Sequence, residues 1–102
     1  MPFFIKTERF TNKTHQLLPE VKKKFLTEHK KWVKNLENSG ENLSSGYLVN
    51  QKKEPGGGGY LILEASCYEK AKFLIEQDPM IKNNLVSWDL QEWIPVAGKL
   101  LK

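Results

Sequence analysis

The sequence predicts an α+β domain in which one four-stranded antiparallel sheet carries two helices on the same face. Three observations lead to this prediction. Apolar residues alternate along several short segments, two other segments have helical periodicity, and the order is strand, helix, strand, strand, helix, strand. That order is typical of the ferredoxin-like split βαβ fold. A chain of 102 residues is long enough for one domain, so we expect a single domain over residues 1–102.

The first predicted strand is FFIKTERF, residues 3–10. Along it, one set of alternate residues is Phe3, Ile5 and Thr7, and the other set is Phe4, Lys6 and Glu8. Residues 11–20 follow as a connection, and Pro19 suits the first turn of the next helix.

A long amphipathic helix is predicted from about Pro19 to Ser39, with Gly40 as its stop. At 100° per residue, one arc of roughly 120° holds Val21, Phe25, His29, Trp32, Val33 and Leu36. The opposite side holds Lys23, Lys24, Lys30, Lys31 and Lys34. His29 is therefore a polar residue in the middle of an apolar stripe.

The next two predicted strands, residues 42–50 and 59–66, are joined by QKKEPGGG at residues 51–58, and a fourth glycine, Gly59, follows. A phosphate-binding glycine loop lies between a strand and a helix. Here the glycines lead directly into a strand, so we interpret them as a flexible hairpin connection.

The second predicted helix starts at Ser66, which with Glu69 matches the capping-box pattern. One face of this helix holds Cys67, Ala71, Leu74, Ile75 and Asp78, so we expect Cys67 to be buried and inert. Pro79 disfavours helical geometry at Asp78, which places the acid at the end of the stripe. Residues 84–93 alternate as the last strand.

Composition limits the classes of partner. The single cysteine, Cys67, excludes an internal disulfide and favours the cytoplasm, and no apolar stretch is long enough to predict a membrane partner. A net charge of +4 raises the question of nucleic-acid binding. Arg9 is the only arginine, however, and the lysines lack interleaved aromatic residues. We therefore expect a solvated lysine face and no nucleic-acid partner, with weak anion binding as the alternative.

Two residues are candidates for catalysis. The His29 imidazole can exchange a proton near neutral pH, and Asp78 is a carboxylate on an apolar face, which should be paired. Because both helices cover the same sheet face, we expect His29 and Asp78 to meet as a base and the group that orients it. The alternatives are a structural histidine and an aspartate that only caps the following turn.

Aromatic residues could wall an apolar pocket around this pair, namely Trp32, Trp88, Trp93 and Tyr47, together with Met80. The alternative is that they belong to the core or to a dimer interface. No cluster has the spacing of metal ligands, and no cofactor fingerprint follows a strand, so we predict neither a metal nor a cofactor.

Over most of its length the chain resembles the YciI-like (YCII-related) family. The resemblance lies in HKKWVKNL, NSGENLSSG, GGYLILEAS, YEKAKFLI, the DPM that begins at Asp78, and a closing strand that ends in Trp93. It implies a ferredoxin-like fold that dimerises through its sheets and is related to the dimeric α/β barrels such as muconolactone isomerase. It also implies a site around His29 and Asp78, with Ser45 and Gly46 nearby.

Some members of this family are enzymes, among them dehydrochlorinases of chlorinated hydroxyquinols. This chain departs from the family pattern in two places. Leu26 stands where many members have an arginine, and Met80 stands where they often have a phenylalanine. The missing arginine removes an anion-binding group.

We therefore expect a homodimeric protein that acts on a small cyclic or unsaturated molecule by elimination or isomerisation. His29 would be the general acid or base, and Asp78 would orient it and favour its protonated form. Predicted substrate-binding residues are Trp32, Ser45, Gly46, Met80 and Trp93. The alternative is a non-catalytic module that binds a small ligand or mediates dimeric interactions.

Overall fold

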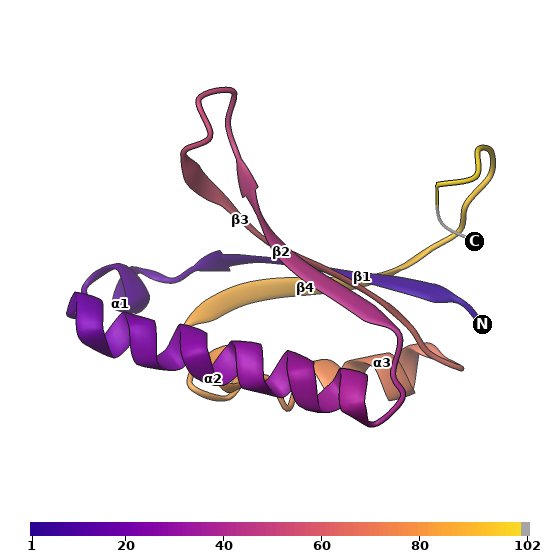
Figure 1. Cartoon of the computed structure of the whole chain (residues 1–102), viewed down its shortest axis with the longest axis horizontal. Helices are drawn as coiled ribbons and strands as arrows, with labels where there is room; N and C mark the ends of the chain where they lie inside the picture. Colours follow the sequence, from indigo (N-terminus) through magenta and orange to yellow (C-terminus); the bar gives the residue numbers. More distant parts are fainter. Residues whose placement is uncertain (101–102) are drawn as a thin grey trace.

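Four strands form one antiparallel sheet in the order β2-β3-β1-β4 (Figure 1). They are β1 (Phe3–Phe10), β2 (Leu43–Val49), β3 (Pro55–Glu64) and β4 (Val86–Trp93). The computed structural model describes residues 1–100. The central strand β1 pairs with β3 on one side and β4 on the other. This sheet, with helices on one face, confirms the predicted ferredoxin-like α+β fold.

Two main helices and two single-turn helices cover this face (Figure 1). The long helix α2 (Pro19–Asn38) lies within one residue of its predicted bounds. The short α1 (Asn12–His15) falls in the segment that was predicted as a connection. Among residues 1–100, no helix has both the length and the apolar character needed to cross a membrane.

The second predicted helix, from Ser66 to Asp78, is shorter in the structure, where α3 spans Tyr68–Ile75. A single-turn helix that was not predicted, α4 (Pro79–Lys82), follows it. Asp78 between them has an extended backbone, with φ −61° and ψ 126°, as expected of a residue before proline. The prediction of a capping box was wrong. Cys67, not Ser66, is the N-cap residue of α3, and no side chain caps this helix. Cys67 is also exposed rather than buried, because it lies outside the helix in an extended conformation.

The register of β1 decides which of its residues face the helices. Phe4 pairs with Leu63, and Lys6 pairs with Leu61 on one side and Leu90 on the other. These partners are all buried. Because side chains alternate between faces along a strand, Phe4, Lys6 and Glu8 all lie on the helix-covered face.

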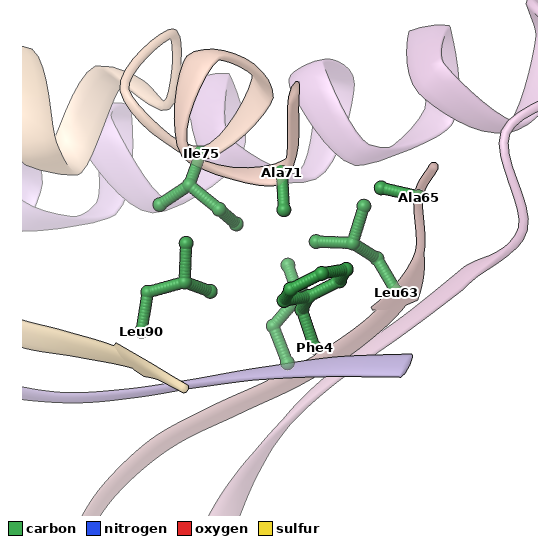
Figure 2. Close-up of a cluster of buried hydrophobic side chains, with 7 residues drawn as sticks. Phe4, Leu63, Ala65, Ala71, Ile75 and Leu90 are labelled. Atoms are coloured by element: carbon green, nitrogen blue, oxygen red, sulfur yellow. The ribbon is translucent and has the colours of Figure 1, made fainter. Parts of the chain in front are cut away.

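The main core lies between α3 and the sheet (Figure 2). Its buried members are Phe4, Leu61, Leu63, Ala65, Ala71, Ile75 and Leu90. A smaller cluster, Met80, Leu85 and Val86, lies beside it, and Trp88 packs against both. Full burial of a side chain such as Ile75 contributes about 1.5–3 kcal/mol.

Helix α2 is packed less tightly than α3. None of its residues is fully buried, and its apolar stripe is half-buried. This partial cover leaves room for a cavity between α2 and the sheet.

Candidate functional site: a histidine and an aspartate at a cavity wall

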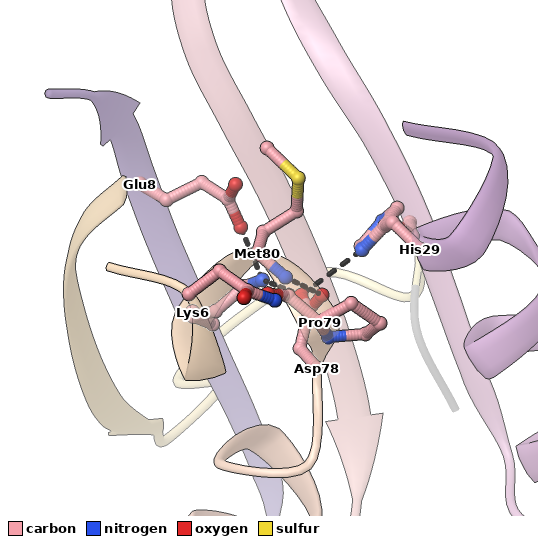
Figure 3. Close-up of polar contacts among 8 residues, drawn as sticks. Lys6, Glu8, His29, Asp78, Pro79 and Met80 are labelled. Carbon is pink, nitrogen blue, oxygen red and sulfur yellow. Dashed lines mark hydrogen bonds and ion pairs between the residues drawn. The ribbon is translucent and has the colours of Figure 1, made fainter. Parts of the chain in front are cut away.

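Asp78 is the fully buried centre of a polar cluster (Figure 3). Its Oδ1 accepts a hydrogen bond of 2.9 Å from the backbone N–H of Met80, which caps α4. Its Oδ2 accepts hydrogen bonds from His29 Nδ1 at 2.9 Å and from Lys6 Nζ at 3.2 Å. The aspartate therefore caps a turn and also holds the histidine, so the two sequence-based interpretations of Asp78 are compatible.

Two opposing effects act on the pKa of the Asp78 carboxyl. Burial alone would raise this pKa, because it disfavours the charged form. The hydrogen bond from His29, the charges of His29 and Lys6, and the Met80 N–H together outweigh burial and hold the pKa below its ordinary value. Asp78 is therefore ionised at neutral pH.

The position of Asp78 determines the tautomer of His29. An ionised carboxylate only accepts hydrogen bonds, so the neutral imidazole carries its proton on Nδ1. The lone pair is then on Nε2, which lies 3.2 Å from Ser45 Oγ on β2. Only 17% of the His29 side chain is exposed. The Trp32 ring packs beside it, with ring centroids 5.6 Å apart.

His29 and Ser45 line a cavity of about 780 Å³. Its walls come from the end of β1, from α2, from β2 and the start of β3, and from Met80 of α4. Side chains and glycines on these walls include Phe10, Leu26, Val33, Tyr47, Gly58 and Gly59. A volume in this range suits a small organic molecule.

The structure brings together most, but not all, of the predicted site residues. His29, Ser45, Gly46 and Met80 line the cavity, and Asp78 lies behind its wall in contact with His29.

Three of the predicted aromatic wall residues are not at the cavity. Trp88 packs against the two core clusters instead. Trp32 packs on the main core under His29, and within residues 1–100 its buried Nε1 has no hydrogen-bond partner. Trp93 pairs with Phe3, and their rings lie 6.2 Å apart. Because Phe3 alternates with the helix-facing Phe4, Trp93 lies on the opposite face of the sheet from the cavity. We therefore leave all three tryptophans out of the candidate pocket.

Lys6 and Glu8 are site residues that the sequence reasoning missed. Lys6 is fully buried, and Glu8 lines the cavity. The only signal in the sequence is that Lys6 and Glu8 lie on the same face of the first strand as Phe4, and the sequence does not say which face the helices cover. Arg9, His15 and Lys30 also line the cavity.

The chemistry available here is proton transfer. His29 is anchored through Nδ1, and Nε2 is the nitrogen that can exchange a proton with a molecule in the cavity. Residues 1–100 contain no group of three metal-ligating side chains.

No protein-family model matches this sequence, and no curated protein matches it either. Two solved structures are similar in fold. One is the 5-chloro-2-hydroxyhydroquinone dehydrochlorinase TftG from Burkholderia phenoliruptrix AC1100, in complex with 2,5-dihydroxybenzoquinone. It aligns with a TM-score of 0.68 and 16% identity over 90% of this chain and 93% of that chain. The other is the de novo designed protein Ferredog-Diesel, with a TM-score of 0.56 and 15% identity over 89% and 84% of the two chains. At these identities the likeness shows the ferredoxin-like α+β fold.

Proposed function

We propose that this protein is a small-molecule enzyme that catalyses elimination or isomerisation through proton transfer at His29. The observation that carries the proposal is the 2.9 Å contact between His29 Nδ1 and the buried Asp78 carboxylate at the wall of a cavity. A general base needs a fixed orientation, an unprotonated nitrogen and access to a substrate. His29 meets all three conditions in this arrangement.

In the proposed step, His29 Nε2 takes a proton from a carbon or hydroxyl of the substrate. The electron pair left behind forms a new double bond, and a leaving group departs with its own electron pair or the proton returns at another atom. The negative charge of Asp78 compensates the positive charge that His29 acquires. The substrate would be a small cyclic or unsaturated molecule, as the size of the cavity allows.

Membership of the YciI-like family is part of the proposal. It is supported by the ferredoxin-like fold and by the contacts that link His29 to Asp78 and Ser45. TftG, which has the same fold, is a dehydrochlorinase, and dehydrochlorination is an elimination. This relationship makes 5-chloro-2-hydroxyhydroquinone a rational first compound to assay.

We also propose a homodimer that forms through the sheet face opposite the helices. Phe3, Ile5, Ile62 and Trp93 are only half-buried on that face of the single chain. A second copy of the sheet would cover these apolar side chains. A cytoplasmic location, expected from the single cysteine, stays a prediction.

The test is turnover of chlorinated hydroxyquinols, enol compounds and lactones by the wild type and by His29→Ala and Asp78→Asn. Loss of the base should lower kcat at least a hundredfold, and Asp78→Asn should also lower it, because the histidine loses its ionic partner. Glu92→Gln is the matched control, since Glu92 is an exposed carboxylate of β4 outside the cavity. Turnover that survives both site changes would exclude the roles assigned here. Ligand binding without any turnover would favour the non-catalytic module.

A further inference from the structure

Lys6 links the two carboxylates of the site. Its ammonium group is fully buried, lies 3.2 Å from Asp78 Oδ2 and forms an ion pair with Glu8 Oε1 (Figure 3). Replacing a buried ion-pair network by apolar residues is often neutral or stabilising. The stability of the fold therefore does not explain why Lys6 and Glu8 stand at positions where two apolar side chains would pack against the helices.

Glu8 is the member of this network that reaches the cavity. Its side chain is 11% exposed, and it lines the same cavity as His29. In Figure 3, Glu8 and His29 lie on either side of Asp78, with the Met80 side chain between them. Because Glu8 Oε1 is paired with Lys6 and both oxygens of a carboxylate are acceptors, the second oxygen can accept a hydrogen bond from a molecule in the cavity.

The glycine run of β3 makes room for Glu8. A Cβ atom on Gly59 would lie 2.8 Å from Glu8 Cγ and 3.0 Å from its Cδ. A Cβ atom on Gly58 would lie 2.2 Å from the Glu8 backbone oxygen. Residues 51–58 were interpreted as a flexible connection before a strand at 59–66, but β3 already begins at Pro55, and Gly58 and Gly59 pack directly against Glu8.

We infer that Glu8 contacts the substrate, which is a small ring with a hydroxyl group that donates a hydrogen bond to the Glu8 carboxylate. Lys6 is a positioning residue that holds Glu8 and joins it to Asp78. This inference rests on the proposed function. It narrows the substrate class to rings that present a hydroxyl to the Glu8 carboxylate while another atom faces His29 Nε2.

The first test compares two probes, hydroquinone and 1,4-dimethoxybenzene, which share a ring but differ in hydrogen-bond donors. Both probes are neutral at pH 7, so a difference between their affinities does not come from a difference in net charge. Chemical-shift titrations of the full chain should show that the wild type prefers hydroquinone. A hydrogen bond to a charged acceptor contributes enough that Glu8→Gln should reduce this preference about tenfold. Glu92→Gln should leave the preference unchanged.

A second test moves the Glu8 side chain without changing any charge. Gly59 does not have the positive φ that disfavours other residues, so Gly59→Ala adds only a methyl group against Glu8. We expect Gly59→Ala to reduce the preference for hydroquinone as Glu8→Gln does. This variant keeps the inference testable if changes at the buried Lys6 prevent folding.

A third test addresses the positioning role of Lys6. In Lys6→Met the Asp78 carboxyl, followed by its ¹³C chemical shift, should titrate at a higher pH than in the wild type, and the preference for hydroquinone should fall. Lys6→Arg should restore both. A residue with only a packing role would not change the titration of Asp78 and would not be rescued by a charged replacement.

The inference is overturned if the wild type does not distinguish the two probes, if neither probe binds, or if Glu8→Gln keeps the preference. Failure of the proposed function has a different signature. If Glu8→Gln loses the preference but His29→Ala does not impair turnover of any compound, the role of Glu8 stands and the role of His29 as base does not.

Discussion

Ser45 Oγ lies 3.2 Å from His29 Nε2, on the side of the imidazole ring opposite Asp78. This serine is exposed on the edge strand β2 and lines the cavity. The hydroxyl therefore occupies the place from which a substrate would reach the base.

We predict that Ser45→Ala changes kcat/KM less than tenfold. In the proposed mechanism the hydroxyl is a hydrogen-bond partner of Nε2, and a substrate atom can replace it. Steady-state kinetics of Ser45→Ala beside His29→Ala would measure the difference. A loss as large as that of His29→Ala would instead assign Ser45 the role of a nucleophile in a serine, histidine and aspartate arrangement.

The Asp78 carboxyl makes stability depend on acid pH. Its pKa is lower in the folded chain than in the unfolded chain, so its contribution is complete above the unfolded pKa and is lost as pH falls through the folded pKa. We expect the free energy of unfolding of the wild type to decline below about pH 4. Urea unfolding from pH 7 to pH 2 should show a smaller decline for Asp78→Asn. Equal slopes in this range would contradict the lowered pKa, and Glu92→Gln controls for the loss of one carboxylate.

Gly58 should be the least replaceable glycine of the hairpin. It has a φ of +91°, and a Cβ atom would lie 2.2 Å from the Glu8 backbone oxygen. We expect Gly58→Ala to destabilise the fold by about 2 kcal/mol or more, because strain and overlap combine. Gly56→Ala is the matched control, since Gly56 has a φ of +136° but nothing within 4 Å of the added atom. Thermal unfolding of the two variants separates the overlap from the backbone strain, and equal losses would show that overlap is unimportant.

The proposed dimer predicts that a charge on the open sheet face dissociates it. Ile62 lies on that face in β3, paired with Ile5 and Ser44. Ile62→Glu should convert a dimer into a monomer, because a charge buried in an apolar interface is not compensated. Light scattering after size-exclusion chromatography measures the mass, with Asn35→Glu, at an exposed position of α2 on the helix-covered side of the sheet, as the control. A wild type that is monomeric at high concentration would exclude this dimer.

Much of the fold follows from short-range patterns in the sequence. The 3.6-residue periodicity predicts that α2 is a helix, because lysines lie on one side and apolar residues on the other. Pro19 and Gly40 predict its bounds to within one residue. The second helix was predicted too long. Its apolar stripe and Pro79 placed the end at Asp78, whereas α3 ends at Ile75. A stripe of apolar residues can continue past the last helical residue, so periodicity alone does not give the end of a helix.

The candidate site was predicted only in part. His29 and Asp78 stand out because each is a polar residue on an apolar stripe, and the topology brings two such stripes to one sheet face. Lys6 and Glu8 belong to a strand whose alternate faces both contain apolar residues, so burial of a lysine was not evident from that strand alone. The contact that identifies Lys6 joins residues separated by 72 positions, which only the folded chain reveals.

The double use of Asp78 has a consequence for ligand binding. Its two oxygens are held by different elements, one by the first turn of α4 and the other by side chains of α2 and β1. The rotamer freedom of this carboxylate is therefore lost when the chain folds, and none is left to be lost when a ligand arrives. The loss of side-chain entropy of Asp78 therefore occurs on folding and not on binding. The His29 imidazole, which Asp78 holds, is already oriented before a ligand enters the cavity.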